Sequence, residues 1–333
     1  MNGSDPGGRA AESDRGGWPT ATIGVDIGGT SIRAAVVGPD HSVLAAREAS
    51  TPHTPEETDD ALVALVGELR DRHPVAGVGL AVAGFVSSDR TRVMFAPHLA
   101  WRDDPVPSRL AARMGLPVVM DHDVNAAVWA EVRSGVAVGS AVSLLVALGT
   151  GIGAGLVVDG RLYRGAHGVA PELGHVVLVP GGRECPCGKR GCWERYCSGT
   201  ALAVTATELM TAEPAGTGPL WTMCGGDPGT LTGRMVAAAA DAGDPVARAA
   251  LTELGRWLAV GLAMAADILD PELIIIGGGV AGAAPHFLPV ARRHLATMIT
   301  GAGARPAPRV ALASFGSDAG IIGAAMLAAA AAS

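Results

Sequence analysis

Lysine, aromatic residues and charged residues are all scarce in this chain of 333 residues. Lys189 is its one lysine, which excludes a Walker-type P-loop, because that glycine-rich turn must be followed by Lys and Ser or Thr. The formal net charge of −7 disfavours a nucleic-acid-binding surface and a polybasic membrane anchor, since both need clustered cations. The 49% hydrophobic and 17% charged residues exclude a largely disordered protein. At ~150 residues per domain, the length predicts about two domains.

Signals for secretion or membrane insertion are also lacking. The first 20 residues have no apolar core, so we expect a disordered tail over residues 1–21 and not a signal peptide. Residues 134–158 carry no charge and are long enough to span a membrane. Their many Gly, Ser and Thr residues instead favour a strand, a glycine-rich turn and a second strand. A cytoplasmic location is therefore expected.

Two glycine-rich segments repeat at an offset of 121 residues: VDIGGTSIRAAVV at 25–37 and VALGTGIGAGLVV at 146–158. Each predicts a hairpin in which an apolar strand enters a glycine turn and a second apolar strand leaves it. A chance likeness of two buried hairpins is the alternative. A true repeat predicts two similar α/β domains that share a cleft, each presenting a glycine turn to it.

The glycine turns suit phosphate binding, because backbone N–H groups can approach an anion closely where no Cβ intervenes. Asp26 precedes the first turn where the second has Ala147, and a carboxylate there indicates a Mg²⁺ ion between it and the phosphates. A third cluster, Gly277–Gly279, follows an apolar run that reads as a buried parallel strand ending near a ligand, or else as a plain strand-to-helix turn. Helices are expected over about 55–72, 199–212, 244–267 and 318–332, the last with Asp318 as its N-cap.

Residues 116–131 combine an apolar strand with a polar cluster, Asp121, His122, Asp123 and Asn125, followed by a helix from about Ala126. Polar residues at the carboxyl end of a buried strand are typical of α/β active sites. A carboxylate near a helix N-terminus is held ionised, so Asp123 is a candidate general base for a substrate hydroxyl. An N-cap and a surface turn would explain one of these acids but not the whole cluster.

Crowded cysteines without a secretion signal favour metal binding over disulfides; they are Cys185, Cys187, Cys192, Cys197 and Cys224. The first three give three thiolates within eight residues, and a tetrahedral Zn²⁺ would take a fourth ligand from His175 or Cys197. Reduced structural thiols are the alternative. A zinc ion with four protein ligands would be structural. It would hold the loop that carries two acids able to bind sugar hydroxyls, Glu172 and Glu194.

The chain resembles the ROK sugar kinases, a family of bacterial glucokinases, related hexose and amino-sugar kinases and some sugar-responsive repressors. The resemblance covers roughly residues 22–330. It rests on DIGGT at 26–30, GTGIGAG at 149–155, GAHGVAPELGH at 165–175, CPCGKRGCWE at 185–194 and IIIGGGV at 274–280. The cysteine motif beside E-L-G-H is highly specific, whereas the wider actin-like ATPase group shares DIGGT.

The resemblance implies an α/β fold of two ribonuclease-H-like (actin-like ATPase) domains with ATP and sugar in an interdomain cleft. The boundaries expected are 22–135 with the C-terminal helix 318–333, and 136–317 with the zinc-binding loop. It further implies a homodimer and the cofactors ATP, catalytic Mg²⁺ and structural Zn²⁺. Asp123 matches the catalytic base. The implied substrate-binding residues are Gly84, His98, His122, Asp123, Glu172, His175 and Glu194. The implied zinc ligands are His175, Cys185, Cys187 and Cys192. The implied nucleotide-binding residues are Asp26, Gly28, Gly29, Thr30, Gly149, Thr150, Gly151, Gly277, Gly278 and Gly279.

Two residues depart from the family pattern. His98 and His122 stand where the family's glucokinases have sugar-contacting asparagines, and an imidazole offers one donor and one acceptor on a bulkier ring. The expected reaction is ATP-dependent phosphorylation of a primary hydroxyl of a glucose-like hexose. A C7-cyclitol or amino-sugar acceptor is the alternative, and polyphosphate in place of ATP stays open. A repressor is disfavoured because about 22 residues precede DIGGT, too few for a helix-turn-helix domain. A silent sugar-binding protein is disfavoured because Asp123 and both phosphate turns are present.

Overall fold

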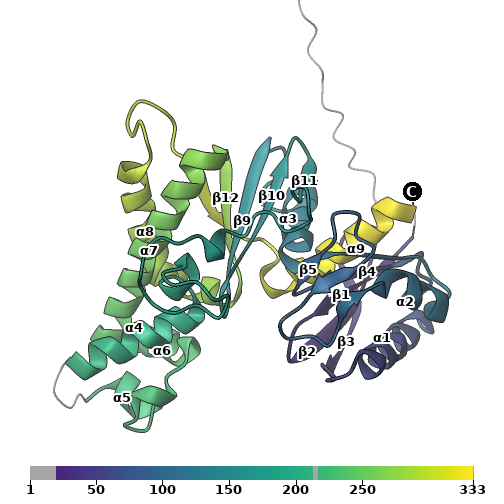
Figure 1. Cartoon of the computed structure of the whole chain (residues 1–333), viewed down its shortest axis with the longest axis horizontal. Coiled ribbons are helices and arrows are strands. Elements are labelled where there is room, and N and C mark those ends of the chain that lie inside the picture. Colours follow the sequence, from purple (N-terminus) through teal and green to yellow (C-terminus); the bar gives the residue numbers. More distant parts are fainter. Residues whose placement is uncertain (1–19, 213–216, 333) are drawn as a thin grey trace, which may run out of the picture.

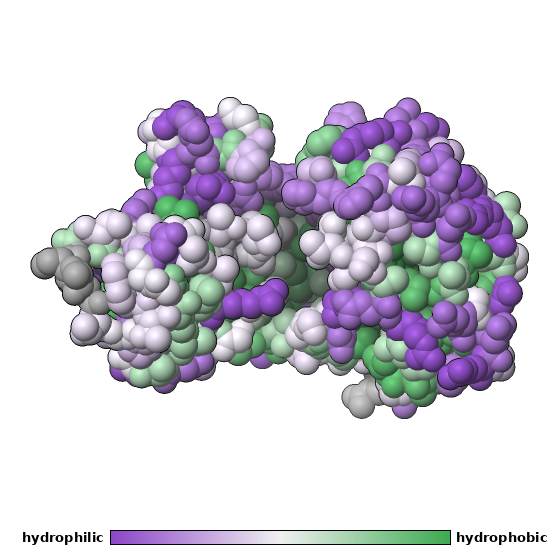
Figure 2. Space-filling model, turned by 90° about the horizontal axis from the view of Figure 1, so that it is seen from below, coloured by the Kyte–Doolittle hydropathy of each residue, from purple (hydrophilic) through white to green (hydrophobic). Residues whose placement is uncertain are grey.

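The computed structural model describes residues 20–212 and 217–332, which form two lobes (Figure 1). Most of the predicted tail, residues 1–19, lies outside the described residues. The surface is hollowed between the lobes (Figure 2). Each lobe is built on a five-stranded sheet with helices on both faces.

The first sheet has the strand order β3-β2-β1-β4-β8. Its first three strands are antiparallel, and β4 and β8 run parallel to β1. The strands are β1 (Thr22–Ile27), β2 (Ser31–Val37), β3 (Val43–Ser50), β4 (Val78–Val82) and β8 (Val118–His122). A small antiparallel sheet beside it consists of β5 (Phe85–Val86), β6 (Val93–Phe95) and β7 (Arg102–Asp104).

The second sheet repeats this topology, with the order β11-β10-β9-β12-β13 and the same pattern of strand directions. Its strands are β9 (Val142–Leu148), β10 (Ile152–Val158), β11 (Arg161–Tyr163), β12 (Leu273–Gly277) and β13 (Arg309–Leu312). The two predicted hairpins are β1–β2 and β9–β10, and β10 lies 121 residues after β2 at both of its ends. The internal repeat is therefore confirmed as a repeated sheet.

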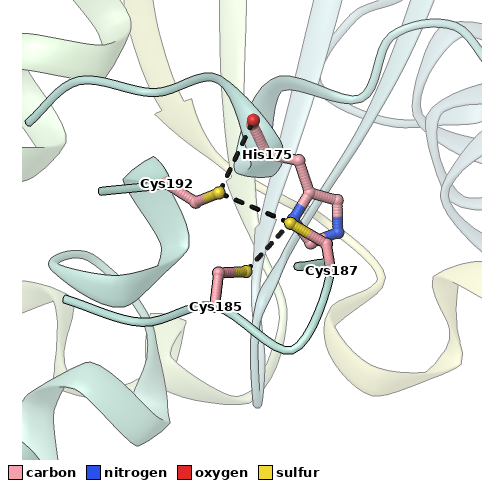
Figure 3. A group of neighbouring side chains, drawn as sticks. All are labelled: His175, Cys185, Cys187 and Cys192. Carbon is pink, nitrogen blue, oxygen red and sulfur yellow. Dashed lines mark hydrogen bonds between the residues drawn. The ribbon is translucent and has the colours of Figure 1, made fainter. Parts of the chain in front are cut away.

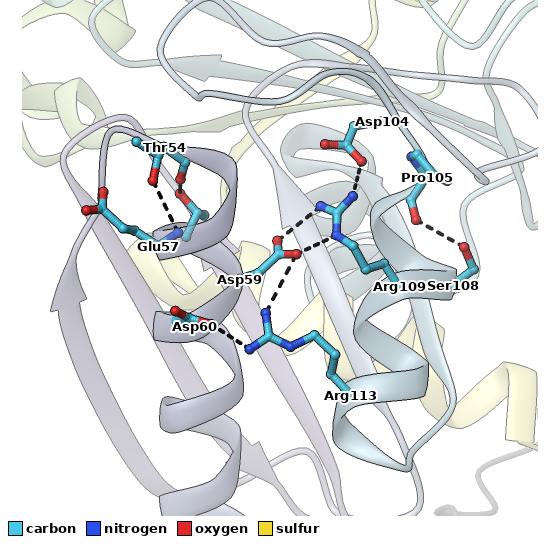
Figure 4. Close-up of polar contacts among 10 residues, drawn as sticks. Thr54, Glu57, Asp59, Asp60, Asp104, Pro105, Ser108, Arg109 and Arg113 are labelled. Carbon is cyan, nitrogen blue, oxygen red and sulfur yellow. Dashed lines mark hydrogen bonds and ion pairs between the residues drawn. The ribbon is translucent and has the colours of Figure 1, made fainter.

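Helices α1 (Pro55–Arg70) and α2 (Val106–Met114) cover the outer face of the first sheet. A polar network joins them (Figure 4). Asp59, only 4% exposed, accepts hydrogen bonds from Nε and a terminal nitrogen of Arg109 at 2.5 and 3.2 Å, and Arg109 also pairs with Asp104. The buried carboxylate of Asp59 on α1 thus joins this helix to Arg109 of α2.

The outer face of the second sheet is covered by the remaining helices, with a core of Leu, Ile and Ala side chains. They are α4 (Gly199–Ala212), α5 (Pro219–Met223), α6 (Gly233–Asp241), α7 (Pro245–Leu269) and α8 (Ala284–Met298). Among the described helices, α7 is the one long and apolar enough to cross a membrane, and 61% of its most apolar window is buried inside the protein. The helices predicted over 55–72, 199–212 and 244–267 correspond to α1, α4 and α7.

Helices α3 (Asp123–Ser134) and α9 (Ala319–Ala332) lie between the two sheets and pack against each other (Figure 1). Each follows the last strand of one sheet and covers the inner face of the other, α3 on β9 and β10 and α9 on β1 and β4. Glycines make the close approach possible. A Cβ at Gly79 of β4 would lie 1.8 Å from the carbonyl oxygen of Ala324, and one at Gly323 would lie 1.7 Å from that of Ala126.

One sequence expectation needs correction here. The helix after the polar cluster begins at Asp123, three residues before Ala126, so the candidate base belongs to the first helical turn. The C-terminal helix begins at Ala319, and Asp318, the last residue of the short 3-10 helix η5 (Gly316–Asp318), directly precedes it at the predicted N-cap position. The uncharged stretch 134–158 contains the end of α3 and the β9–β10 hairpin, as the strand interpretation requires.

Candidate active site

Asp123 stands at the point where β8 gives way to α3. Its Oδ1 accepts a hydrogen bond from the backbone N–H of Val124 at 2.7 Å and lies 3.2 Å from Nε2 of His122. Among the described residues no hydrogen bond reaches Oδ2, and the side chain is 36% exposed. One carboxylate oxygen is thus held by the protein while the other is available to a ligand.

The neighbouring Asp121 has a different role, because its carboxylate is 1% exposed. It accepts hydrogen bonds from Nε and a terminal nitrogen of Arg164 at 2.9 and 2.5 Å, and from the side chain of Asn125 at 2.8 Å. Arg164 follows β11, so this pair fastens the polar cluster to the other lobe. Of the four residues in the predicted cluster, Asp121 and Asn125 are structural.

A cavity of about 620 Å³ brings Asp123 together with Asp26 of β1 and with the glycines that follow β12. Asp26 lies opposite Arg33 in the β1–β2 hairpin, and Oδ2 of Asp26 is 2.6 Å from a terminal nitrogen of Arg33. Burial raises the pKa of Asp26, the hydrogen bond from Arg33 opposes this rise, and the negative charge of Asp123 adds to it. The two carboxylates are therefore close enough to repel each other, which favours a cation between them.

A second cavity, of about 750 Å³, adjoins the first and shares Gly279 and Gly282 with it. It is lined by Gly149 and Thr150 of the second glycine turn and by polar residues of α6 and the segment before it. Gly278 must be glycine, since its φ is +80° and a Cβ would lie 2.5 Å from the carbonyl oxygen of Leu148. The two cavities form a continuous glycine-lined space beside Asp123.

Three further predicted residues gather on the loop between β11 and α4. Nδ1 of His175 lies 3.5 Å from Oε1 of Glu194, and Nε2 of the same ring lies 4.0 Å from Oε2 of Glu172. Burial raises the pKa of Glu172, His122 and His175 oppose the rise, and the charges of Asp123 and Glu194 add to it. Asp123 lines the 620 Å³ cavity, and its charge also acts on Glu172, so the base is within electrostatic reach of the acidic loop.

The four predicted zinc ligands form one cluster (Figure 3). Their ligand atoms, from His175, Cys185, Cys187 and Cys192, all lie within 4.8 Å of one another. Sγ of Cys187 and Sγ of Cys192 are 3.6 Å apart, and Sγ of Cys185 is 3.7 Å from Nδ1 of His175. Zinc–sulfur bonds of about 2.3 Å would place two sulfur atoms of a tetrahedron about 3.8 Å apart, so the donor set fits Zn²⁺.

Cys197, the other candidate fourth ligand, is not part of this cluster. It is fully buried, and its thiol lies 3.7 Å from the carbonyl oxygen of Leu254. His175 is therefore the residue that completes the set, with Nδ1 on the cysteine side and Nε2 on the side of Glu172.

Some predicted residues lie outside the two cavities. Gly28, Gly29 and Thr30 line neither of them, and a Cβ at Gly29 would lie 2.6 Å from Cβ of the exposed His98. Gly84 packs against Ala96 of the loop after β6, where a Cβ would lie 2.5 Å away. Gly151 is nearer to the acidic loop than to the cavities, because a Cβ there would lie 2.3 Å from Oε2 of Glu194.

Sequence reasoning missed four residues of the site. Arg33 could have been found from the hairpin, since pairing of the two strands sets it opposite Asp26. The contact of Arg164 with Asp121 could not be predicted from the sequence, because 43 residues separate the two. Arg234 and Asp241 line the second cavity from α6, a helix that the sequence analysis did not identify.

Comparison with known proteins places these features in a family. A sequence model of the ROK family matches residues 22–331. A glucokinase from Streptomyces coelicolor is 40% identical over 307 residues, 92% of this chain and 97% of that protein. The crystal structure of a ROK family glucokinase from Streptomyces griseus in complex with glucose and AMPPNP has a TM-score of 0.84 at 40% identity, over 92% of this chain and 99% of that one. A ROK hexokinase from Thermus thermophilus has a TM-score of 0.74 at 32% identity, over 92% and 97%.

Proposed function

Because the chain belongs to the ROK family, we propose that it is an ATP-dependent sugar kinase that phosphorylates a hydroxyl group of a hexose. The fold is the two-domain, actin-like α/β fold of its structural neighbours. The observation that carries the proposal is that Asp123, with one carboxylate oxygen unengaged, lines a glycine-lined cavity within electrostatic reach of the acidic loop.

Asp123 is the general base in this proposal. Its Oδ2 takes the proton of the accepting hydroxyl while Oδ1 stays bonded to the N–H of Val124. The hydroxyl oxygen forms a bond to the γ-phosphorus as the bond from that phosphorus to the β–γ bridging oxygen breaks, and ADP leaves. Most of the acceleration comes from holding the two substrates in line, because phosphoryl transfer offers the protein little covalent chemistry.

The nucleotide occupies the two glycine-lined cavities. Gly277–Gly279 and the Gly149–Gly151 turn present backbone to the phosphates, and α6 contributes Arg234 and Asp241 at the far end of the space. Gly28, Gly29 and Thr30 line neither cavity, so in this proposal they contact the phosphates only after the two lobes close. Asp26 would hold Mg²⁺, which neutralises charge on the phosphate oxygens when bound.

The sugar lies against the acidic loop. Glu172 and Glu194 accept hydrogen bonds from its hydroxyls, and Nε2 of His175 adds a contact while Nδ1 faces the zinc ligands. The zinc ion is structural in this proposal, and it fixes the imidazole that the sugar meets. Gly84, His98 and His122 form the remaining wall of the sugar site.

An acceptor screen tests the proposal. The acceptors are glucose, mannose, glucosamine, N-acetylated sugars and cyclitols; ADP release is followed with ATP as donor, and the phosphorylated acceptor itself with polyphosphate as donor. We expect turnover with ATP and a hexose, with a phosphorylated product identified by mass spectrometry. Turnover with a cyclitol or amino sugar alone would establish the alternative acceptor, for which His98 and His122 are the supporting residues. An absence of turnover with every acceptor would overturn the proposed function.

The remaining proposals concern organisation. We propose that residues 22–135 with the C-terminal helix form one domain and residues 136–317 the other, with closure over the substrates. The exchange of α3 and α9 between sheets makes these two helices the hinge. We also propose that the protein is cytoplasmic and forms a homodimer. Sedimentation analysis of the purified protein tests the homodimer.

A further inference from the structure

Arg33 is the one basic side chain among the described residues that line the 620 Å³ cavity. It faces two acids there, Asp26 and Asp123. A triphosphate entering this cavity would meet two negative charges and a single positive one. Lys189, the only lysine, is engaged elsewhere, since its Nζ lies 2.7 Å from the carbonyl oxygen of His175 on the zinc-binding loop.

Contacts from two elements hold the guanidinium of Arg33 in place. One terminal nitrogen donates to Oδ2 of Asp26 at 2.6 Å and to the carbonyl oxygen of Ser317 at 2.7 Å. The other lies 3.5 Å from Oδ1 of Asp318. Asp26 belongs to β1, and Ser317 and Asp318 belong to η5, so the side chain spans from the first sheet to the start of the C-terminal helix.

These contacts leave donors for a ligand. A guanidinium has five N–H groups, and within residues 20–212 and 217–332 the described hydrogen bonds of Arg33 engage two of them closely and a third weakly. The side chain lines the cavity and is 30% exposed. The N–H groups that stay free are the one on Nε and one on the terminal nitrogen near Asp318, and each can donate to one phosphate oxygen.

We propose that Arg33 binds the terminal phosphate groups of the nucleotide, with Asp26 and the carbonyl of Ser317 fixing its guanidinium at the cavity wall. This inference rests on the proposed kinase function and adds a phosphate-binding residue to it. Arg33 supplies the positive charge that a lysine supplies in other phosphate sites, and it does so from the strand opposite Asp26.

Calorimetry with AMP and with AMPPNP, each in the presence of Mg²⁺ and of EDTA, tests the role of Arg33. In R33Q we expect the affinity for AMPPNP to fall about tenfold to a hundredfold and that for AMP to change by less than about twofold, because only AMPPNP carries the terminal phosphates. The control is R47Q on the adjacent β3, where Arg47 pairs with Glu68 at 3.3 Å on the surface. It should leave both affinities unchanged. Equal losses for AMP and AMPPNP, or no loss for either, would overturn the inference.

Chemical modification of the unaltered protein gives a second readout if R33Q does not fold. Phenylglyoxal labelling of Arg33, followed by mass spectrometry, should be suppressed by AMPPNP in EDTA and not by AMP. Labelling that AMPPNP leaves unchanged would contradict the proposal. Failure of the unaltered protein to bind AMPPNP at all would instead count against the kinase function itself.

Discussion

Two aspartates that stand two positions apart should respond in opposite ways to replacement by asparagine. In D123N the new amide oxygen can still accept the N–H of Val124, but the group that replaces Oδ2 cannot take a proton. General base catalysis contributes about 10²–10⁴ in rate, so we expect turnover to fall by that factor, about 3–5 kcal/mol in the barrier. The free energy of unfolding should change by less than about 1 kcal/mol, since the side chain is 36% exposed and its interaction with the helix dipole is small.

In D121N we expect the opposite result, a large loss of stability with turnover retained. The amide of the new side chain would face the guanidinium of Arg164, which now donates two hydrogen bonds to a carboxylate that is 1% exposed. Breaking a fully buried pair costs about 3–5 kcal/mol, and because Arg164 is itself 21% exposed we expect about 2–4 kcal/mol. The protein that remains folded should keep its base at Asp123 and therefore measurable turnover.

Urea unfolding followed by tryptophan fluorescence measures the stability of both variants, and ADP release with the best acceptor from the screen measures their turnover. Far-ultraviolet circular dichroism confirms that each variant is folded at the assay temperature. A D123N protein that keeps more than about a tenth of the original turnover would refute the assignment of Asp123 as base. A D121N protein as stable as the unaltered chain would refute the structural role given to the pair with Arg164.

Three further predictions concern the zinc cluster, the hinge and the acidic loop. Metal analysis of the purified protein should find about one zinc ion per chain. The variant C187S should lose this zinc, and the control C224S, whose cysteine lies outside the cluster, should keep it. The carboxylate of Glu131 is fully buried and accepts hydrogen bonds from three backbone N–H groups, two of them on the segment before α9. E131Q should therefore lower the free energy of unfolding by about 2–3 kcal/mol. Urea unfolding checks this, with the surface variant E253Q as the control. Burial raises the pKa of Glu172 above its ordinary value of 4.5. As the pH is lowered, Glu172 should therefore become protonated earlier than an exposed glutamate, and the KM for the acceptor should rise. If the KM of E172Q for the acceptor rises with falling pH as much as that of the unaltered protein, Glu172 does not have this role in acceptor binding.

The repeated hairpins could be predicted because they are local. Alternating apolar residues around a glycine turn set both strands and their pairing, and the offset between the two copies predicts a second sheet of the same kind. The zinc cluster was equally predictable, since three of its ligands lie within eight residues and glycines allow the chain to fold around one ion. The two acids of the same loop, Glu172 and Glu194, were predicted together with the cluster because they flank it in the sequence.

Local patterns could not predict that α3 and α9 exchange sheets, and it was the resemblance to the ROK family that assigned the C-terminal helix to the first domain. Periodicity shows that a helix has an apolar face but not which sheet that face covers, and both helices have small residues that fit either one. The close approach depends on pairs of positions far apart in the chain, such as Gly79 with Ala324. The ion pair of Asp121 with Arg164 could not be predicted from the sequence for the same reason, because it joins residues of different lobes.

His122 shows how the departure from the family pattern bears on chemistry as well as on substrate choice. The resemblance implies a sugar contact at this position, yet its Nε2 lies 3.2 Å from Oδ1 of Asp123. The ring thus stands on the Oδ1 side of Asp123, where the N–H of Val124 also donates, and leaves Oδ2 open to the acceptor. An asparagine would offer a smaller amide group in its place, so the histidine sets a bulkier ring directly beside the base. Acceptor specificity and turnover are therefore linked at His122, and a change at this position should alter both together.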